Sequence, residues 1–455
     1  MKRGRLLLVV PSAYPLGGLA TWLDYIVPGL RKLGWDIHVA LTSGIHHDMN
    51  AYLKLHPIGP VIPLQSRTGT QEGRIRAIMS LLSKVDPDIV GVVNIPDTAL
   101  AVARLRRAGR FRGRVALLNH GIQATLTTDI ARLSRVLDAV VTVNRLAAAL
   151  AVHLGGMPFE RVLYAPGGAN TDTTKRSRQI ASGDDNPLRL SYVGRIERSQ
   201  KRAEDLVSLV DALRTRGLKF ELRIAGDGPG RAELQDAMDM RGAAPPEVSF
   251  TGSLNANQID SDIYPSSDVV IISSHWETGP LVAWEAMAHG AVLVTSRYVG
   301  AGLEGSLRDG ENCLMYPVGD MASAADCVAR LQDPQLRCEL ASAASAMVQA
   351  RYSHGASLAR WSAAFEVISS LPERPLGLSE ALALEALIGS AGRLDKLLGK
   401  GIAETFRAII GRRDRHVEPG GEWPHTLGPP SDETIFWRVA EQLDQVQCDP
   451  GLRQS

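Results

Sequence analysis

Short runs of apolar and β-branched residues alternate with longer helical patterns along most of this 455-residue chain. The runs are apolar at successive positions, as strands of a parallel sheet covered by helices on both faces must be. The stretches between them are long enough for the crossover helices that parallel strands require. A first series lies at 5–10, 35–41, 88–93, 114–118, 138–143 and 161–165, and a second at 188–193, 219–225, 247–250, 268–273 and 291–296.

Two such series predict an α/β protein with two Rossmann-like, doubly wound parallel-sheet domains, because one hydrophobic core seldom serves more than about 250–300 residues. We expect an N-terminal domain over 1–180 and a C-terminal domain over 187–354, joined by the linker-like stretch SGDDNP at 182–187. Ligands of such sheets bind at the carboxyl ends of the strands. The expected site is therefore a crevice that both sheets face.

The chain after residue 354 has a different pattern. A crossover helix is expected at 355–372, packing back on the N-terminal domain through Leu358, Trp361, Phe365 and Ile368. Residues 373–455 form a helical and Pro/Gly-rich extension, with a linker at 416–432 and a helix at 433–445. Its residues 394–410 carry one apolar stripe, made by Leu394, Leu397, Leu398, Ile402, Phe406, Ile409 and Ile410. We expect this stripe to pack on the protein body or a partner.

Charge and cysteine content narrow the class of protein. The chain has 50 Lys and Arg against 49 Asp and Glu, so no overall field attracts nucleic acid. Its cysteines have neither a C-x-x-C pair nor metal-ligand spacing, which favours packing roles in a reducing cytosol for Cys313, Cys327, Cys338 and Cys448. The apolar run before Pro11 has only five residues, too few for a signal-peptide core or a membrane span. We therefore expect a cytoplasmic protein.

The most informative stretch is DVVIISSHWETGPLVAWEAMAHGAVLVTS, residues 268–296. It predicts a strand, a loop, and a helix that begins near Pro280 and stops before Gly290. The first N–H groups of this helix, around Gly279 and Leu281, suit an anion such as phosphate. Glu277 in the loop and Glu285 in the helix can accept hydrogen bonds from sugar or ribose hydroxyls.

A basic loop follows the first strand of the second series. In GRIERSQKR, Gly194, Arg195 and Lys201 lie at the carboxyl end of strand 188–193, where cations can stabilise a diphosphate leaving group. Lys201 is the first choice for the second cation and Arg202 the alternative. For Arg198, a solvated position in the turn is a simpler interpretation than binding of the diphosphate.

The N-terminal domain contributes two further candidates. Gly17 and Gly18 follow the first strand, where glycine lets backbone approach a ligand closely. A dinucleotide fingerprint would need G-x-G-x-x-G and an acidic residue after the second strand, which instead runs into Thr42 and Ser43. A redox enzyme is therefore disfavoured. The second candidate is His120, which follows strand 114–118.

Glu277 and Glu285, with seven residues between them and Ala286, Met287, Ala288 and Gly290 after them, resemble the E-x7-E element of retaining glycosyltransferase family 4, also called glycosyl transferases group 1. That family has the GT-B fold. One departure is Gly279-Pro280 in place of the usual Phe-Gly, which removes an amide donor at Pro280. AGDGPGRAEL (225–234) is similar to the family's Gly-rich turn. PGGAN (166–170) is similar to its interdomain signature, with Gly167 and Asn170 replacing Asn and Asp.

The resemblance implies roles for these residues. Glu277 would lie near the donor sugar, Glu285 would bind the ribose, and His120 would lie next to the sugar. Arg195 and Lys201 would bind the donor phosphates, which the loop of Gly17 and Gly18 would approach from the other domain.

The implied reaction is transfer of a sugar from a nucleotide diphosphate to an acceptor hydroxyl with retention of configuration, in polysaccharide or glycolipid biosynthesis. Besides this nucleotide-sugar donor no cofactor is implied, and the absence of a D-x-D pair after a strand predicts independence from metal. The acceptor would be a carbohydrate or a lipid-linked molecule.

Three questions stay open in the sequence. A sugar-nucleotide epimerase of the same architecture would share the phosphate site, and a non-catalytic nucleotide-sugar-binding scaffold would share the fold. Residues 394–410 have basic residues on their other faces, so a peripheral contact with the inner face of an anionic membrane is the alternative to packing on the protein. A homo-oligomer is a further alternative.

Overall fold

The computed structural model describes residues 3–15, 17–172 and 186–445. They form two compact units, of which the first comprises the described residues within Met1–Val143, Ala147–Ala165 and Leu358–Val439. The second comprises those within Asn144–Leu146, Pro166–Ser357 and Ala440–Ser455. The PGGAN segment at 166–170, which lies within the N-terminal domain expected over 1–180, belongs to the second unit. Residues 182–185 of the expected linker lie outside the described residues.

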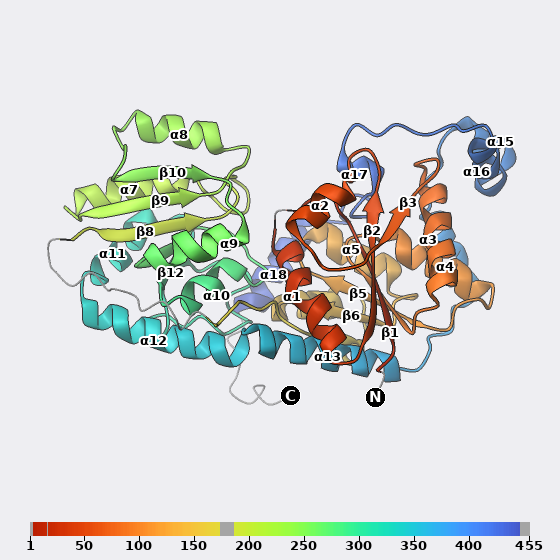
Figure 1. Cartoon of the computed structure of the whole chain (residues 1–455), viewed down its shortest axis with the longest axis horizontal. Helices are drawn as coiled ribbons and strands as arrows, with labels where there is room; N and C mark the ends of the chain where they lie inside the picture. The colour runs from red at the N-terminus through yellow and green to blue at the C-terminus, as the bar shows by residue number, and fades with distance from the viewer. Residues whose placement is uncertain (1–2, 16, 173–185, 446–455) are drawn as a thin grey trace. The chain divides into compact units, whose positions relative to one another are not determined.

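The first unit is built on a seven-stranded sheet in which all the paired strands are parallel (Figure 1). The sheet order is β3-β2-β1-β4-β5-β6-β7. The strands are β1 (Arg5–Val10), β2 (Asp36–Ser43), β3 (Ile62–Gln65), β4 (Ile89–Val92), β5 (Arg114–Asn119), β6 (Ala139–Thr142) and β7 (Val162–Tyr164). The helices that follow them are α1 (Gly18–Lys32), α2 (Met49–Leu55), α3 (Gln71–Val85), α4 (Asp97–Arg107), α5 (Ala124–Leu133), α6 (Arg145–His153) and the 3-10 helix η1 (Phe159–Arg161).

Alternate residues of the strands enter two separate cores of this unit. Leu7 and Val9 of β1 pack with α3, α4 and α5, whereas Leu6, Leu8 and Val10 pack with α1 on the other face. This division explains why the strands are apolar at every position. Helix α13 (His354–Ser370) adds Trp361, Phe365 and Ile368 to the α1 face.

The second unit repeats the plan with a six-stranded parallel sheet in the order β10-β9-β8-β11-β12-β13. Its strands are β8 (Leu188–Val193), β9 (Phe220–Ala225), β10 (Val248–Gly252), β11 (Val269–Ile272), β12 (Val292–Ser296) and β13 (Leu314–Tyr316). Its helices are α7 (Asp205–Thr215), α8 (Arg231–Asp239), α9 (Ala256–Gln258), η2 (Ile259–Ile263), η3 (Tyr264–Ser266), α10 (Leu281–Ala288), α11 (Met321–Arg330) and α12 (Pro334–Arg351). Helices α7 and α11 cover one face of the sheet, and α10 and α12 the other.

The C-terminal extension differs from the expectation in three ways. Its helices are α14 (Leu378–Ala386), α15 (Arg393–Leu398), α16 (Lys400–Ile409), α17 (Pro419–Glu422) and α18 (Glu433–Gln445). The stripe at 394–410 is interrupted at Gly399, whose φ of 77° ends one helix and starts the next. Its apolar residues face away from the body.

The third difference concerns residues 416–432, which are bound to the first unit along their length rather than forming a free linker. Trp423 is buried in the core cluster to which α3, α4 and α5 also contribute. The Glu422 carboxylate accepts hydrogen bonds from the N–H groups of Ile45 (2.8 Å) and His46 (2.7 Å). The Leu427 N–H donates to Asp129 over 2.8 Å.

Two further observations bear on the sequence-based expectations. Within the described ranges, no helix is long and apolar enough to cross a membrane. Cys313 and Cys327 are buried, but Cys338 is exposed on α12, so the expected packing role is wrong for it. Cys448 lies outside the described residues.

Candidate active site

The predicted donor residues of the second unit follow two neighbouring strands. Gly194, Arg195 and Lys201 lie after β8, and Glu277 lies after β11, which pairs with β8. The strand order reverses between these two strands, since β9 and β10 continue on one side and β12 and β13 on the other. Ligands of open parallel sheets bind at such a switch point. The topology thus brings the basic loop and the Glu277 loop together.

Glu277 is almost fully buried and directly paired with Lys201. Its side chain is 6% exposed, and its Oε1 lies 2.5 Å from the Lys201 Nζ. The Ser274 hydroxyl donates to the same oxygen over 2.6 Å. A buried carboxylate needs such partners because desolvation disfavours its charge. The lysine ammonium has three N–H donors, so the bond to Glu277 leaves others for a ligand.

The basic loop is held in shape by a carboxylate that the sequence analysis did not single out. Glu197 accepts hydrogen bonds from the N–H groups of Ser199 (3.0 Å), Gln200 (2.9 Å) and Lys201 (2.5 Å). Burial alone would raise the pKa of Glu197, but these bonds and the Ser199 hydroxyl lower it below its ordinary value. Glu197 therefore stays charged and fixes the backbone that carries Lys201.

The other cations of this loop have different surroundings. Arg195 is exposed, and its Nη2 lies 3.3 Å from the Gln200 Oε1. Arg202 makes two bonds to Asp205, of 2.8 and 3.0 Å, which raise its pKa. Arg198 pairs with Glu233 at the surface. The structure thus directs Lys201, not Arg202, to Glu277.

The Gly-rich turn after β9 packs against the backbone of the basic loop. A Cβ on Gly226 would lie 1.9 Å from the Gly194 carbonyl oxygen, and one on Gly228 would lie 2.4 Å from that of Ile196. The N–H of Ile196 donates to the Asp227 carbonyl over 2.9 Å. Only glycine allows this approach of two backbones.

Helix α10 begins at Leu281, with Pro280 as its N-cap residue and without a side-chain cap. The sequence placed proline at the first helical position, so the helix starts one residue later than expected. Gly279 has a φ of 82° and Gly290 a φ of 75°, which fit the turns before and after the helix. The uncapped start suits an anion.

Glu285 is half-buried on this helix and is held by a second residue that the sequence did not indicate. The Tyr264 hydroxyl donates to the Glu285 Oε2 over 2.7 Å. Burial raises the pKa of Glu285, although the Tyr264 bond acts in the opposite direction. Tyr264 is the first residue of the short 3-10 helix η3 before β11, where neither periodicity nor a motif marks it.

The predicted residues of the first unit lie after β1 and β5. Gly17 is the N-cap residue of α1, and a Cβ there would meet no atom within 4 Å. His120 packs edge-on against Trp22, with ring centroids 4.7 Å apart, and stacks with Trp361 at 5.8 Å. Its Nε2 is buried and has no hydrogen-bond partner among the described residues. Burial lowers the pKa of His120 to about 4, so its ring is neutral near pH 7.

A cavity of about 970 Å³ in the second unit lies away from these residues. It is bordered by residues 297–308 and by α18, and none of the predicted donor residues lines it. The Asp444 carboxylate of α18 accepts there from the N–H groups of Gly300 (2.8 Å) and Leu303 (2.9 Å). Within the described residues, no group of three or more His, Cys, Asp or Glu side chains is arranged to hold a metal ion.

Solved structures share this architecture. The lipopolysaccharide outer core galactosyltransferase WaaB superimposes with a TM-score of 0.64 at 16% identity, covering 79% of this chain and 99% of that one. HepE from Anabaena, solved in complex with UDP-glucose, superimposes with a TM-score of 0.62 at 19% identity, covering 81% and 100%. These likenesses show the fold, which is the GT-B fold of two Rossmann-like domains.

Sequence comparison finds a family whose model matches part of the chain. Residues 187–333, most of the second unit, match the family model described as glycosyl transferases group 1. An alpha-D-kanosaminyltransferase from Streptomyces kanamyceticus is 31% identical over 206 residues, or 43% of this chain and 52% of the relative. A D-inositol 3-phosphate glycosyltransferase from Acidothermus cellulolyticus is 30% identical over 220 residues, or 45% and 47%. The match thus spans about half the length of these curated relatives.

Proposed function

We propose that this chain is a retaining hexosyltransferase, or a related glycosyltransferase, that moves a sugar from a nucleotide diphosphate to an acceptor hydroxyl. The observation that carries the proposal is the buried Lys201–Glu277 pair at the switch point of a sheet whose sequence matches group 1 glycosyltransferases. That HepE was solved with UDP-glucose supports a nucleotide sugar as the donor. Polysaccharide or glycolipid assembly is the proposed setting.

The charges of the site suggest how the reaction proceeds. Arg195, Lys201 and the start of α10 would stabilise the diphosphate as it departs, because preorganised cations and N–H groups act most strongly on charge that develops in the transition state. Glu277 would orient Lys201 and accept a hydrogen bond from the sugar, and Glu285 would bind the ribose. His120, neutral near pH 7, would lie next to the sugar.

Glu277→Ala should lower turnover at least 100-fold, since removing one preorganised group from such a site typically costs about 10²–10³ in rate. The measurement is release of nucleoside diphosphate in the presence of acceptor. Glu339→Ala replaces an exposed glutamate of α12 in the same unit and should leave turnover unchanged. Unchanged turnover in Glu277→Ala would refute the assignment.

Metal independence belongs to the same proposal, because cations of the protein and a helix start supply the charge that a metal ion would otherwise supply. Transfer should therefore persist in EDTA at the rate measured without it. Complete loss that Mg²⁺ or Mn²⁺ restores would contradict this part of the proposal and leave the donor site standing.

Product identity separates the transferase from its alternatives. Incubated with a nucleotide sugar and no acceptor, an epimerase would interconvert nucleotide sugars at full rate. A binding scaffold would produce no change with or without acceptor. The proposed transferase should form product only with acceptor, apart from slow hydrolysis of the donor.

A further inference from the structure

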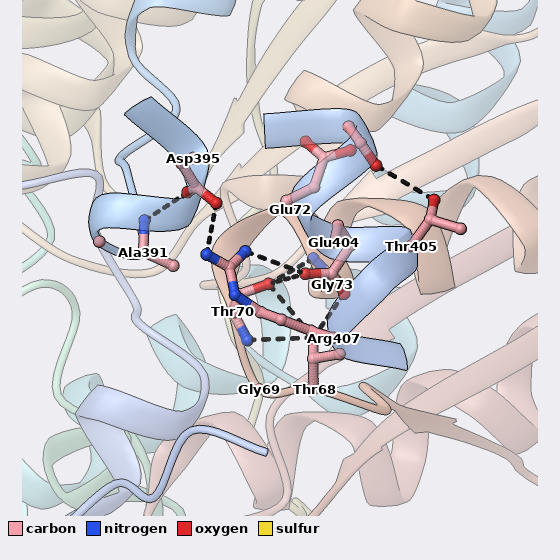
Figure 2. A network of polar contacts seen from close by, with 12 residues as sticks. Thr68, Gly69, Thr70, Glu72, Gly73, Ala391, Asp395, Glu404, Thr405 and Arg407 are labelled. Carbon is pink, nitrogen blue, oxygen red and sulfur yellow. Dashed lines mark hydrogen bonds and ion pairs between the residues drawn. The ribbon is translucent and has the colours of Figure 1, made fainter. Parts of the chain in front are cut away.

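Helices α15 and α16 form a hairpin that turns its polar face toward the protein (Figure 2). The buried residues of α16 are Ala403, Glu404 and Arg407, and that of α15 is Asp395. An amphipathic helix of a globular protein ordinarily buries its apolar stripe. Here the arrangement is inverted.

The polar face makes hydrogen bonds to the segment between β3 and α3 and within the hairpin. Glu404 accepts hydrogen bonds from the hydroxyls of Thr68 (2.5 Å) and Thr70 (2.6 Å), which lie between β3 and α3. Arg407 pairs with Asp395 over 2.5 Å, and both side chains are 3% exposed. Figure 2 shows these groups converging between α16 and the segment Thr68–Gly73. Buried charges require such partners, so this network fixes the rotation of α16 about its axis.

Arg76 of α3 holds the hairpin through a second set of hydrogen bonds. Its Nη2 donates to the Gly401 carbonyl over 2.6 Å and its Nη1 to the Thr405 hydroxyl over 2.9 Å. Figure 1 shows α15 and α16 beside α3 at the margin of the first unit. The hairpin is therefore anchored at the end of the sheet where β3 ends, the same edge at which β1 leads to Gly17 and β5 to His120.

Because the polar face points inward, the apolar stripe is left in solvent. Leu397 is 81% exposed, Ile402 66% and Ile409 78%. Leu398, Phe406 and Ile410 are also exposed, so six of the 17 exposed large apolar side chains of the described residues lie within 397–410. Apolar surface concentrated in this way marks an interaction site.

The charges around this apolar surface have one sign. Arg393 and Lys396 are exposed beside it on α15, and Arg412 is exposed just after α16. The acidic residues of the two helices, Asp395 and Glu404, are buried and already paired. Within the described part of the chain, none of these three cations has an ion-pair partner. An apolar surface flanked by cations complements an anionic lipid surface, whereas two copies of it would repel each other.

We propose that the α15–α16 hairpin docks the protein on an anionic bilayer, with Leu397, Ile402, Phe406 and Ile409 entering the interface and Arg393, Lys396 and Arg412 contacting lipid headgroups. The carboxyl edge of the first sheet then lies close to the membrane surface, where a lipid-linked acceptor would be held. Membrane binding itself does not depend on the proposed transfer reaction.

Sedimentation of the full chain with vesicles tests this proposal. Vesicles with about 30% phosphatidylglycerol in phosphatidylcholine should bind the chain at least tenfold more tightly than pure phosphatidylcholine, and salt should weaken binding. Ile402→Ser with Ile409→Ser should lower the affinity at least tenfold, as should Lys396→Glu with Arg412→Glu. Phe159→Ser is the matched control, because Phe159 is 77% exposed elsewhere in the first unit.

Three outcomes would overturn the proposal. The first is that the wild-type chain does not bind anionic vesicles. The second is that both double variants bind anionic vesicles as tightly as the wild type does. The third is a concentration-dependent dimer that the isoleucine variant abolishes, which would assign the surface to a second copy. Circular dichroism and nucleotide binding show whether the variants are folded, and neither readout needs the membrane.

Discussion

At the residue scale, the candidate site depends on charges whose partners are already in place. Lys201 touches Glu277, and Glu197 fixes the backbone that carries Lys201. The sequence predicted Glu277 because it matches the spacing of the E-x7-E element, and Lys201 because cations after a strand suit a diphosphate. It could not indicate Glu197, Ser274 or Tyr264, because a hydrogen bond formed by a loop residue leaves no periodic signal.

His120 gives a test at this scale. Burial between Trp22 and Trp361 lowers its pKa to about 4, so its NMR titration should have a midpoint near 4. The signal can be assigned by its absence in His120→Gln. A midpoint at or above 6.5 would show that the ring is solvated and would contradict this account of its position.

The lowered pKa of His120 makes the free energy of unfolding depend on pH. The unfolded chain binds a proton at His120 below about pH 6.5, whereas the folded chain does so only below about pH 4. Stability from this group is therefore complete above pH 6.5 and is lost as the pH falls toward 4, by on the order of 3 kcal/mol. His120→Gln should show a correspondingly smaller loss of unfolding free energy over that range.

At the element scale, the glycine-rich turn after β9 should contribute both to the free energy of unfolding and to nucleotide binding. Gly226→Ala would place a Cβ 1.9 Å from the Gly194 carbonyl, so one backbone must move. We expect a loss of about 1–3 kcal/mol in the free energy of unfolding, as for other overpacked sites, together with weaker nucleotide binding. Urea denaturation and calorimetry measure the two effects.

The control for this substitution is Gly355→Ala. A Cβ at Gly355 on α13 meets no atom within 4 Å, so alanine there should be neutral or slightly stabilising. Equal stability and equal nucleotide affinity of Gly226→Ala and the wild type would show that the turn does not support the basic loop.

Most strands were predictable from their apolar runs, including the three-residue edge strand β7, but β3 and β13 were missed. β3 is interrupted by Pro63, and β13 has only three residues. Both lie at the edge of a sheet, where proline and short length are tolerated. The orientation of α16 was also missed, since periodicity defines a stripe but not the direction in which it faces.

At the scale of the whole molecule, two Rossmann-like units follow from the two series of strands, and their GT-B fold is confirmed by the solved structures. The extension could not be predicted in the same way. Its residues 416–432 are rich in Pro and Gly, yet single contacts such as those of Trp423 and Glu422 hold them on the first unit. Contacts between residues so distant in sequence have no local signature.

We propose that the second unit binds the diphosphate of a nucleotide sugar through Arg195 and Lys201. Calorimetric titration with UDP, GDP and ADP tests it directly. At least one should bind, and Arg195→Met and Lys201→Met should each weaken that binding about 10- to 100-fold, the usual effect of losing one charge-assisted hydrogen bond. Arg198→Met, which removes an exposed cation from the same loop, should bind as the wild type does. Binding of none of the three nucleotides, or equal affinity in all four proteins, would contradict the claim.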